Sequence, residues 1–412
     1  MLVYHSPFFR RVRAIELLEL IPIRKKIELL KKKKSPFRDE KVSHEFSHTE
    51  IEFTTSPVSV READIIIVCV PTPVYDDHTP NLEPLESAAK SIAPYLRKGG
   101  LVVIESTINP GVSEDIVLPI LKKGSGLRGG EFYLSHCPER INPGDTTWTL
   151  ESIPRVVGSL TEDGLKKTID FYESILKTPV RAMGSLKEAE AVKVVENSFR
   201  DVNIAFVNEL AMSFDRLGID VVNVIEGAAT KPFSFMPHFP GSGVGGHCIP
   251  VDPYYLISYG KQNGFAHHFL SLARKINNYM PIFTVDLLDK ELRGKEMRLA
   301  GSKVAVLGLS YKPNVDDTRE SPSFEIIEIL KSRGAHPVPY DPYAAQFSEA
   351  ESLGEAVEGV VAVIIATAHK EFLSITPEYL LRKGVRVLID GRNCLPKELF
   401  LTSPLSYAGI GR

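Results

Sequence analysis

Short apolar runs alternate with longer segments of mixed polarity over the first 180 residues. The runs at 63–70, 101–104 and 155–158 are almost continuously apolar, as in strands that are buried on both faces. Helix-length segments at 83–97 and 161–176 alternate with these runs. Strands that alternate with helices predict an α/β unit built on a parallel sheet.

The pattern changes in the middle of the chain. Residues 185–217 contain neither Pro nor an internal Gly, which predicts one long helix, and helical sequence continues to about residue 293. A second α/β pattern begins at 303–309, with further strands expected at 338–340, 361–366 and 385–390. We therefore predict an α/β fold with two parallel-sheet domains joined by a long central helix and a helical middle domain.

Composition and charge narrow the class of protein. At 412 residues the chain is long enough for two or three domains. A hydrophobic content of 43% with 25% charged residues is typical of a globular protein. The net charge of −3 argues against a general nucleic-acid binder. The first 34 residues hold ten Lys and Arg against three Glu, which we interpret as a solvated charged arm rather than a nucleic-acid or membrane contact.

The apolar runs and the cysteines indicate the compartment. No run reaches the roughly 18 residues that a membrane-spanning helix requires, and no apolar signal segment is present near the start. Cys69, Cys137, Cys248 and Cys394 form no CxxC pair, which argues against a disulfide framework and a thiolate zinc site. We expect no metal, and a location in the reducing cytoplasm.

A glycine-rich segment places Cys248 four residues before Asp252, in Ser242-Gly-Val-Gly-Gly-His-Cys-Ile-Pro-Val-Asp-Pro-Tyr-Tyr255. Glycines permit close approach of the backbone to a ligand. Pro250 and Pro253 suit a first helical turn, in which Cys248 and Asp252 would share one face. The residues alone leave the thiol three roles: nucleophile, metal ligand or buried filler.

The predicted long helix supplies Lys193 and Asn197 on one face. Such a pair can hold an oxyanion or move a proton, although a lone helical lysine is more often a solvated surface residue. Glu139 follows the strand-like residues 132–135, at the edge of an open α/β sheet where ligands bind. It is a candidate general base.

A second loop with charged residues follows the run 303–309. Lys312 and Arg319 lie in it, and Ser321-Pro322 begins the next predicted helix. The N-terminus of a helix binds anions well, so these residues are candidates for holding a phosphate.

Six motifs in order resemble the UDP-glucose/GDP-mannose dehydrogenase family, over about residue 25 to the C-terminus. The motifs are Val70-Pro-Thr-Pro73, Glu105-Ser-Thr-Ile-Asn-Pro-Gly111, Pro138-Glu-Arg140, the Lys193/Asn197 helix, Gly245-Gly-His-Cys248, and Tyr311-Lys-Pro with Asp317-Thr-Arg-Glu-Ser-Pro322. The resemblance implies NAD as cofactor and oxidation of the C6 alcohol of a nucleotide sugar to a carboxylate. Two hydrides pass to two NAD, and a cysteine carries the sugar as a thiohemiacetal and then a thioester.

The resemblance also implies roles for individual residues. Cys248 corresponds to the nucleophile, and Asp252 to a residue that assists proton handling beside it. Lys193 and Asn197 correspond to residues that stabilise the alkoxide and the oxyanion. Glu139 corresponds to the residue that handles protons during oxidation and hydrolysis.

Binding contacts follow from the same resemblance. Thr72 and Thr107 correspond to NAD contacts, and Arg319 to a residue near the cofactor. The expected UDP-sugar contacts are Glu139, Arg140, Lys193, Asn197, Phe239, Gly241, Gly243, Gly245, Tyr311, Lys312 and Arg392. The long helix is the dimer-forming element of the family. We therefore expect a homodimer or a higher homo-oligomer, with neither nucleic acid nor membrane as partner.

The resemblance assigns three domains and leaves an atypical start. They are an NAD-binding Rossmann-like domain at 25–183, a helical central and dimerisation domain at 184–296, and a UDP-sugar-binding Rossmann-like domain at 297–412. Residues 1–24 stand where the family has its first βα unit, so the first domain is incomplete.

Three segments indicate the sugar. Residues 243–255, 197–205 and 230–237 resemble the branch that acts on UDP-N-acetylhexosamines in making surface-polysaccharide precursors. UDP-N-acetylglucosamine is favoured, with UDP-N-acetylmannosamine or UDP-glucose as alternatives. Arg200 is expected to contact the N-acetylated sugar.

The family's Gly-x-Gly-x-x-Gly loop, which seats the NAD pyrophosphate, has no counterpart because the first glycine of this chain is Gly99. We prefer a shifted reading frame or altered start as the cause, with a functional replacement arm as the alternative. Loss of the first strand is expected to expose neighbouring strand edges, giving poor solubility and weak or no NAD binding. A non-catalytic remnant that binds only UDP-sugar is therefore the rival function.

Overall fold

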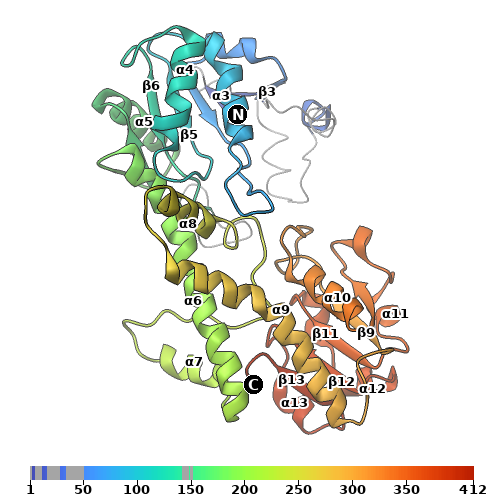
Figure 1. The fold of residues 1–412 in the computed structure, drawn as a ribbon. Helices are drawn as coiled ribbons and strands as arrows, with labels where there is room; N and C mark the ends of the chain where they lie inside the picture. Colours follow the sequence, from blue (N-terminus) through green and yellow to red (C-terminus); the bar gives the residue numbers. More distant parts are fainter. Residues whose placement is uncertain (1, 5–11, 16–27, 34–50, 142–147, 149–151) are drawn as a thin grey trace. The chain divides into compact units, whose positions relative to one another are not determined.

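The computed structural model of the 412-residue chain describes residues 2–4, 12–15, 28–33, 51–141, 148 and 152–412. The chain divides into two compact units, the first made of residues 1–196 and 254–265 and the second of residues 197–253 and 266–412 (Figure 1). Two helices, α6 (Leu186–Leu217) and α8 (Asp252–Gln262), contribute residues to both units.

The first unit is built on a sheet with the strand order β3-β2-β1-β4-β5-β6-β7-β8. β4, β5 and β6 are parallel neighbours, whereas β7 is antiparallel to β6 and parallel to β8. The strands are β1 (Leu2–Tyr4), β2 (Val12–Ile15), β3 (Ile51–Thr54), β4 (Ile65–Val68), β5 (Leu101–Ile104), β6 (Tyr133–His136), β7 (Arg155–Ser159) and β8 (Val180–Ala182). The helices are α3 (Glu83–Ile92), α4 (Leu118–Ser125), α5 (Glu162–Ile175), the 3₁₀ helices Pro57–Glu62 and Ala93–Tyr95, and the π-helical turn Ser113–Val117.

Helices cover both faces of the parallel part of this sheet. Ile66 and Val102 belong to a core shared with α3 and α4, whereas Val103 packs with Phe171 of α5 in a second core. All four residues of β5 are buried, which explains the continuously apolar run. α5 is capped by Thr161, whose side chain accepts a hydrogen bond from the N–H of Gly164.

The edge of β4 is occupied by β1, which runs antiparallel to it, and β2 and β3 extend the sheet further. The expectation that this edge is exposed is therefore wrong, because the backbone of β1 pairs with it. In the fold that carries a glycine loop, the strand at this place is parallel to its neighbours. The sequence also predicts an atypical segment at 1–24 and a basic arm over the first 34 residues. Most of both lies at 5–11 and 16–27, outside the described residues.

The second unit contains a sheet of parallel strands in the order β10-β9-β11-β12-β13. The strands are β9 (Lys303–Leu307), β10 (His336–Tyr340), β11 (Ala362–Ile365), β12 (Val387–Asp390) and β13 (Ser406–Gly409). The helices of this unit that are not yet named are α7 (Val221–Ala229), α9 (His268–Gly294), α10 (Pro322–Ser332), α11 (Leu353–Ala356), α12 (Pro377–Arg382), α13 (Lys397–Leu401) and the 3₁₀ helices Ala345–Phe347 and Lys370–Ser374.

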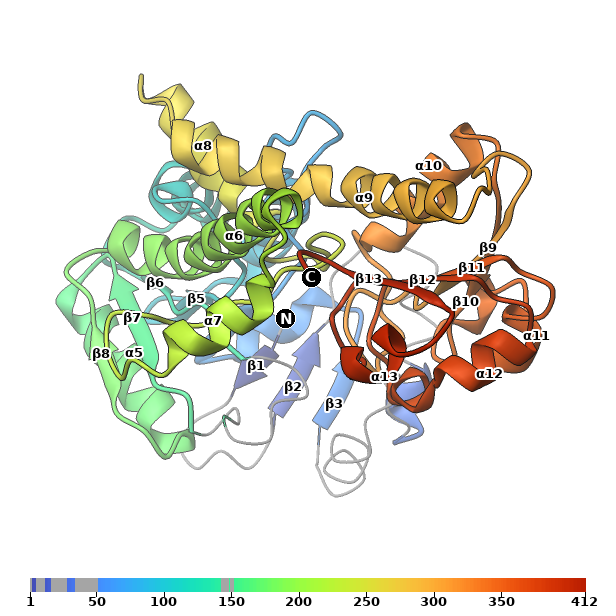
Figure 2. The same cartoon turned by 90° about the horizontal axis from the view of Figure 1, so that it is seen from below.

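Two apolar cores lie on the two faces of this sheet. Figure 2 shows its strands together with the helices α9 to α13. Val306 of β9 packs with Leu288 of α9 and with α10 on one face. Leu307, the next residue, belongs to the core that contains α11, α12 and Phe400 of α13 on the other face. The same alternation along each strand therefore gives a sheet covered by helices on both sides, as the apolar runs predict.

β10 is an edge strand with two prolines, Pro337 and Pro339. The N–H of His336 donates to the carbonyl of Ser302, and the carbonyl of Tyr340 accepts from the N–H of Gly308. The backbone groups of residues 336 and 340 therefore face the neighbouring strand β9, and those of the two prolines face outward.

The predicted fold class is confirmed: both α/β parts have parallel strands, and α6 lies between them in sequence as one long helix. The sequence pattern did not predict β8 and β13, which are short and lack a continuous apolar run, with Arg181 in the middle of β8 and Ser406 at the start of β13. Nor did it predict the irregular segment 231–251, which interrupts the expected helical run before α8. Among the described residues, no helix has both the length and the apolar surface that crossing a bilayer demands.

Candidate active site

The glycine segment of the second unit packs directly against two predicted substrate-binding residues. A Cβ atom on Gly245 would lie 2.7 Å from the Cβ of Tyr311, and one on Gly241 would lie 2.7 Å from Nη1 of Arg392. Gly246 has a φ of 91°, and a Cβ atom on it would lie only 2.8 Å from the ring of Tyr311. The glycines are thus required by close approach and backbone conformation, as the sequence suggests.

Cys248 lies at the end of this segment and is half-buried. Its carbonyl accepts a hydrogen bond of 2.8 Å from the N–H of Asp252, which begins α8. Nδ2 of Asn197 on α6 donates to Oδ2 of Asp252 at 2.5 Å, and both side chains are buried. Three of the predicted catalytic residues therefore converge at one place in the second unit.

Charged side chains surround Tyr311 beside this turn. Burial raises the pKa of Tyr311, and the neighbouring charges of Asp317 and Cys248 raise it further, against Arg319 and Arg200. The phenol is therefore neutral at physiological pH and can donate a hydrogen bond. The predicted substrate residue Tyr311 is thus an electrostatic neighbour of both the Cys248 thiol and Arg200.

Arg319 serves the same turn in two ways. Its carbonyl accepts a hydrogen bond of 3.0 Å from the N–H of Gly246. Its guanidinium is paired with Asp317, with Nη2 and Oδ2 2.5 Å apart. More than half of the arginine side chain is exposed, so the pair leaves it open to an anionic ligand.

Arg392 is held by backbone carbonyls. Its Nε donates to the carbonyl of Ala366 at 2.8 Å and its Nη1 to that of Gly243 at 3.4 Å. Lys312 is half-buried in the loop after β9, and Phe239 is half-exposed before the glycines. Most of the predicted substrate residues of the second unit therefore lie in the segment 239–248 and in the loop 311–320. Arg392 follows β12 and contacts the carbonyl of Gly243 in the first of these.

The predicted NAD contacts Thr72 and Thr107 follow β4 and β5, two adjacent parallel strands. The N–H of Val70 donates to Oγ of Ser106 at 2.8 Å, which ties the two strand ends together. The carbonyl of Thr72 accepts a hydrogen bond of 2.6 Å from the hydroxyl of Tyr255. This edge of the sheet is where α/β folds bind dinucleotides.

Glu139 and Arg140 follow β6 at the same edge of the first unit. Oε1 of Glu139 accepts the N–H groups of Arg140 and Ile141 at 2.6 and 2.7 Å. The guanidinium of Arg140 is paired with Glu196 of α6, with Nη2 and Oε1 2.5 Å apart, and also donates to the carbonyl of Pro154. Arg140 therefore has protein partners, and its predicted contact with the sugar stays a prediction.

The catalytic candidates fall into two groups. Glu139 and Lys193 belong to the first unit, and Asn197, Cys248 and Asp252 to the second. Lys193 and Asn197 nevertheless lie one turn apart on α6, as their spacing predicts.

Sequence reasoning missed a buried group behind Glu139. Arg155, the first residue of β7, is paired with Glu139 and lies 3.9 Å from Oε1 of Glu105. Glu105 in turn accepts a hydrogen bond of 2.5 Å from the hydroxyl of Tyr172. The only sequence signal was Glu105 itself, a charged residue directly after an apolar strand.

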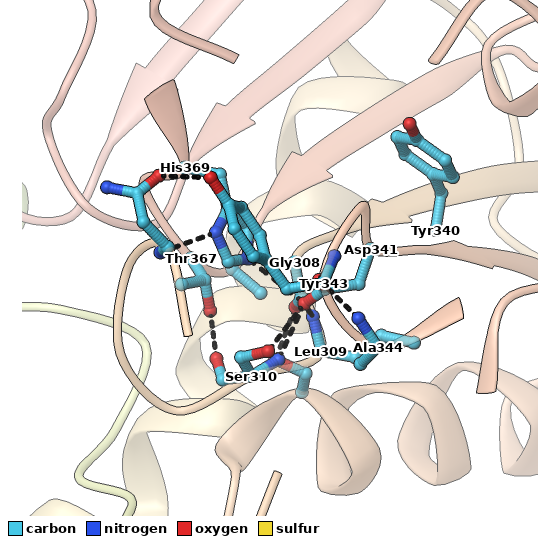
Figure 3. A network of polar contacts seen from close by, with 12 residues as sticks. Gly308, Leu309, Ser310, Tyr340, Asp341, Tyr343, Ala344, Thr367 and His369 are labelled. Carbon is cyan, nitrogen blue, oxygen red and sulfur yellow. Dashed lines mark hydrogen bonds and ion pairs between the residues drawn. The ribbon is translucent and has the colours of Figure 1, made fainter. Parts of the chain in front are cut away.

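Sequence reasoning also missed a polar network in the C-terminal sheet, centred on Asp341 after β10 (Figure 3). Oδ2 of Asp341 accepts the N–H groups of Leu309 and Ser310 at 2.6 and 2.7 Å and a hydrogen bond from Nε2 of His369 at 3.0 Å. Burial opposes ionisation of Asp341, but the hydrogen bonds from His369 and Ser310 hold its pKa far below the usual range. Nδ1 of His369 accepts the N–H of Asn314, which fixes the neutral tautomer of the imidazole and anchors the loop that carries Lys312.

The described residues fit part of an NAD site. The ends of β4 and β5, with Thr72 and Thr107, have the arrangement that such a site requires. The pyrophosphate loop is different, because no glycine precedes Gly99 and β1 runs antiparallel to β4. The strand-end residues expected to contact NAD are therefore present, whereas a glycine cradle for the phosphates is not. Within the parts of the chain that the structure describes, no cluster of His, Cys, Asp and Glu has the composition of a metal site.

Two parallel-sheet domains, with a thiol at the end of a glycine turn and a carboxylate one helical turn later, define a dinucleotide-dependent oxidoreductase of the nucleotide-sugar dehydrogenase class. Residues 22–176, 187–279 and 305–397 match the NAD binding, central and UDP binding domains of the UDP-glucose/GDP-mannose dehydrogenase family. The chain belongs to this family, whose cofactor is NAD.

Individual relatives agree with this assignment. A UDP-N-acetyl-D-mannosamine dehydrogenase of Pyrococcus horikoshii is 37% identical over 382 residues, which are 92% of this chain and 88% of the relative. A UDP-N-acetyl-D-glucosamine 6-dehydrogenase of Pseudomonas aeruginosa is 35% identical over 359 residues, 85% of each chain. The solved structure of UDP-D-ManNAc dehydrogenase from Pyrococcus horikoshii superposes with a TM-score of 0.87 at 35% identity, over 94% of this chain and 91% of that one.

Proposed function

We propose that the chain oxidises the C6 hydroxyl of a UDP-N-acetylhexosamine to the carboxylate in two steps, through a covalent bond to Cys248. The observation that carries the proposal is the junction of Cys248, Asp252 and Asn197 beside the glycine turn. A half-buried thiol that interacts electrostatically with Arg319 is in surroundings that favour a thiolate. We further propose that the enzyme works in the cytoplasm on surface-polysaccharide precursors.

The residues of the chain supply the covalent chemistry. Two NAD molecules, bound one after the other, would each accept one hydride. The Cys248 thiolate adds to the C6 aldehyde and forms a thiohemiacetal, whose oxygen Asn197 and Lys193 stabilise. After its oxidation to the thioester, water attacks the carbonyl carbon, the C–S bond breaks, and the thiol and the sugar carboxylate are released. Glu139 accepts the proton of that water, and Asp252 handles the proton of the thiol.

The segments around Cys248 and the names of two relatives support an N-acetylated sugar. A UDP-N-acetyl-D-mannosamine dehydrogenase matches the chain at 37% identity, and a UDP-N-acetyl-D-glucosamine 6-dehydrogenase matches it at 35%. These identities do not separate the two epimers, so UDP-N-acetylglucosamine and UDP-N-acetylmannosamine are the two substrates to be compared.

Replacing Arg200 by alanine is expected to raise the Michaelis constant for the UDP-N-acetylhexosamine about 10-fold, because a charged hydrogen bond to the sugar contributes roughly 1.5 kcal/mol. The exposed side chain of Arg200 lies among the charges around Tyr311. Lys275→Ala, an exposed cation on α9, is the matched control. An unchanged Michaelis constant in steady-state kinetics would remove Arg200 from the sugar site.

We also propose that α6 forms a homodimer. Val195, Phe199 and Phe206 follow the helical spacing and are each about half exposed, which is unusual for a monomer surface. Sedimentation velocity gives the mass, and a monomer would contradict the proposal.

The decisive assay counts NADH formed per UDP-N-acetylhexosamine consumed. We expect two, because a thiohemiacetal retains the aldehyde until its second oxidation. The assay needs millimolar NAD, since we expect weak cofactor binding without the glycine loop. Micromolar NAD affinity would refute that expectation. No NADH, with UDP-sugar still bound in calorimetry, would instead identify the rival function, a remnant that binds but does not oxidise.

A further inference from the structure

Arg155 is almost completely enclosed, with 4% of its side chain exposed, whereas its partner Glu139 is 35% exposed. One guanidinium nitrogen, Nη2, is paired with Oε2 of Glu139, and Nη1 donates to the carbonyl of Pro138 at 3.2 Å. The carboxylate therefore has an open side that a ligand can reach, and the guanidinium does not. Arg155 therefore contacts Glu139 from the buried side, and its own side chain is too enclosed to contact a substrate.

A second carboxylate holds the guanidinium in place. Glu105, directly after β5, lies 3.9 Å from Nη1 of Arg155 and accepts hydrogen bonds from Tyr172 at 2.5 Å and from the Cys69 thiol at 3.1 Å. The guanidinium carbon of Arg155 also lies 5.7 Å from the centre of the Tyr172 ring. One buried cation is thus shared by two carboxylates, with its orientation fixed from three sides.

The two oxygens of Glu139 have different partners. Oε1 accepts the N–H groups of Arg140 and Ile141, whereas Oε2 faces Arg155. The antiparallel step from β6 to β7 brings Arg155 next to this loop, because Ser135 pairs with Ser159 and His136 with Gly158. This pairing departs from the parallel sheet and gives the loop its cation.

We infer that Arg155 is a positioning residue that sets the orientation of the Glu139 carboxylate, with Glu105 and Tyr172 as its supports. The inference rests on the proposed function, in which Glu139 moves protons. Without Arg155, the carboxylate loses its partner on Oε2 and turns toward water.

The groups that face Arg155 come from the ends of β5 and β6 and from α5: Glu105, Cys137, Glu139 and Tyr172. Burial raises the pKa of Cys137 to about 12 and, with the charge of Glu105, raises that of Tyr172 well above its usual value, so both stay neutral. Burial also raises the pKa of Glu105, against the charge of Arg155 and the hydrogen bond from Tyr172.

The test is the Arg155→Met variant, with Arg181→Met on the adjacent strand as the matched control, because Arg181 pairs with Val156 and is exposed. We expect kcat to fall about 10- to 100-fold, within the roughly 10²–10⁴-fold contribution of a general base, and KM for the UDP-sugar to change less than about 3-fold. Arg155→Lys is expected to restore kcat only in part, because it keeps the charge and loses the fork.

An unchanged kcat in Arg155→Met would overturn the inference. So would a loss of kcat that only follows the folded fraction measured by circular dichroism. A crystal structure of Arg155→Met supplies a readout that does not need activity: we expect the Glu139 carboxylate displaced, and an unmoved carboxylate overturns the inference. Failure of the proposed function is a different result, namely that the unmodified chain forms no NADH.

Discussion

Replacing Cys248 by alanine is expected to abolish oxidation of the sugar to the acid and to leave UDP-sugar binding within about 3-fold. Loss of a covalent nucleophile removes roughly 10⁴-fold or more from kcat. The half-buried thiol is not in the apolar cores, so its removal leaves the fold intact. The measurement is NADH formation from the UDP-N-acetylhexosamine, with calorimetric titration of UDP-sugar on the same sample.

Cys394→Ala is the matched control, because Cys394 is another half-buried thiol of the second unit. Its Sγ is 3.5 Å from Oδ1 of Asp390, a weak contact, and we expect activity within about 2-fold of the unmodified chain. Formation of two NADH per sugar by Cys248→Ala would show that the acid arises without a thioester on this residue, and the proposed mechanism would be withdrawn.

Replacing Asp341 by asparagine is expected to destabilise the C-terminal domain by about 3 kcal/mol or more and to lower its melting temperature by about 6 °C or more. The carboxylate accepts hydrogen bonds from several backbone N–H groups and from His369, and both side chains are fully enclosed. An amide places N–H groups where only acceptors fit, so some donors lose their partner. Thermal unfolding followed by circular dichroism measures the change.

The same variant makes a prediction about pH. The pKa of Asp341 in the folded chain lies below its value of about 4 in an unfolded chain, so its contribution is complete above that pH. It is lost as the pH falls through the folded-state pKa. We therefore expect the difference in stability between the unmodified chain and Asp341→Asn to be constant above about pH 5 and to shrink in acid.

Asp289→Asn is the control for this experiment, since Asp289 forms an i, i+4 pair with an exposed Arg293 on α9. Such a pair contributes about 0.5 kcal/mol or less. Equal effects of the two substitutions at neutral pH would contradict the special role of the enclosed carboxylate.

The sequence predicted elements wherever burial is complete or a helix is long. The run 101–104 coincides with β5, and the stretch 185–217 differs from α6 by one residue. It failed where pairing depends on distant residues: nothing local in 155–159 indicates that β7 runs antiparallel to β6. The direction of β1 was not predictable either, because it depends on its pairing with β4.

The candidate site was predicted to the extent that its chemistry is contained in short motifs. Cys248 and Asp252 share one turn, and Gly245 and Tyr311 meet because the backbone approach needs a glycine. Arg155 and His369 were missed for a physical reason. Each is a single polar residue in an otherwise ordinary segment, and its partners come from other strands.

The outer edge of the C-terminal sheet has a consequence for self-association. Pro337 and Pro339 occupy the two outward positions of β10, where a free strand would present N–H donors. A proline has no N–H, and the carbonyl of Pro339 already accepts the N–H of Glu349 at 2.9 Å, so an approaching strand finds no donor at these two positions. This edge of the UDP binding domain is therefore closed to strand addition, and the sheets of two molecules do not join through it.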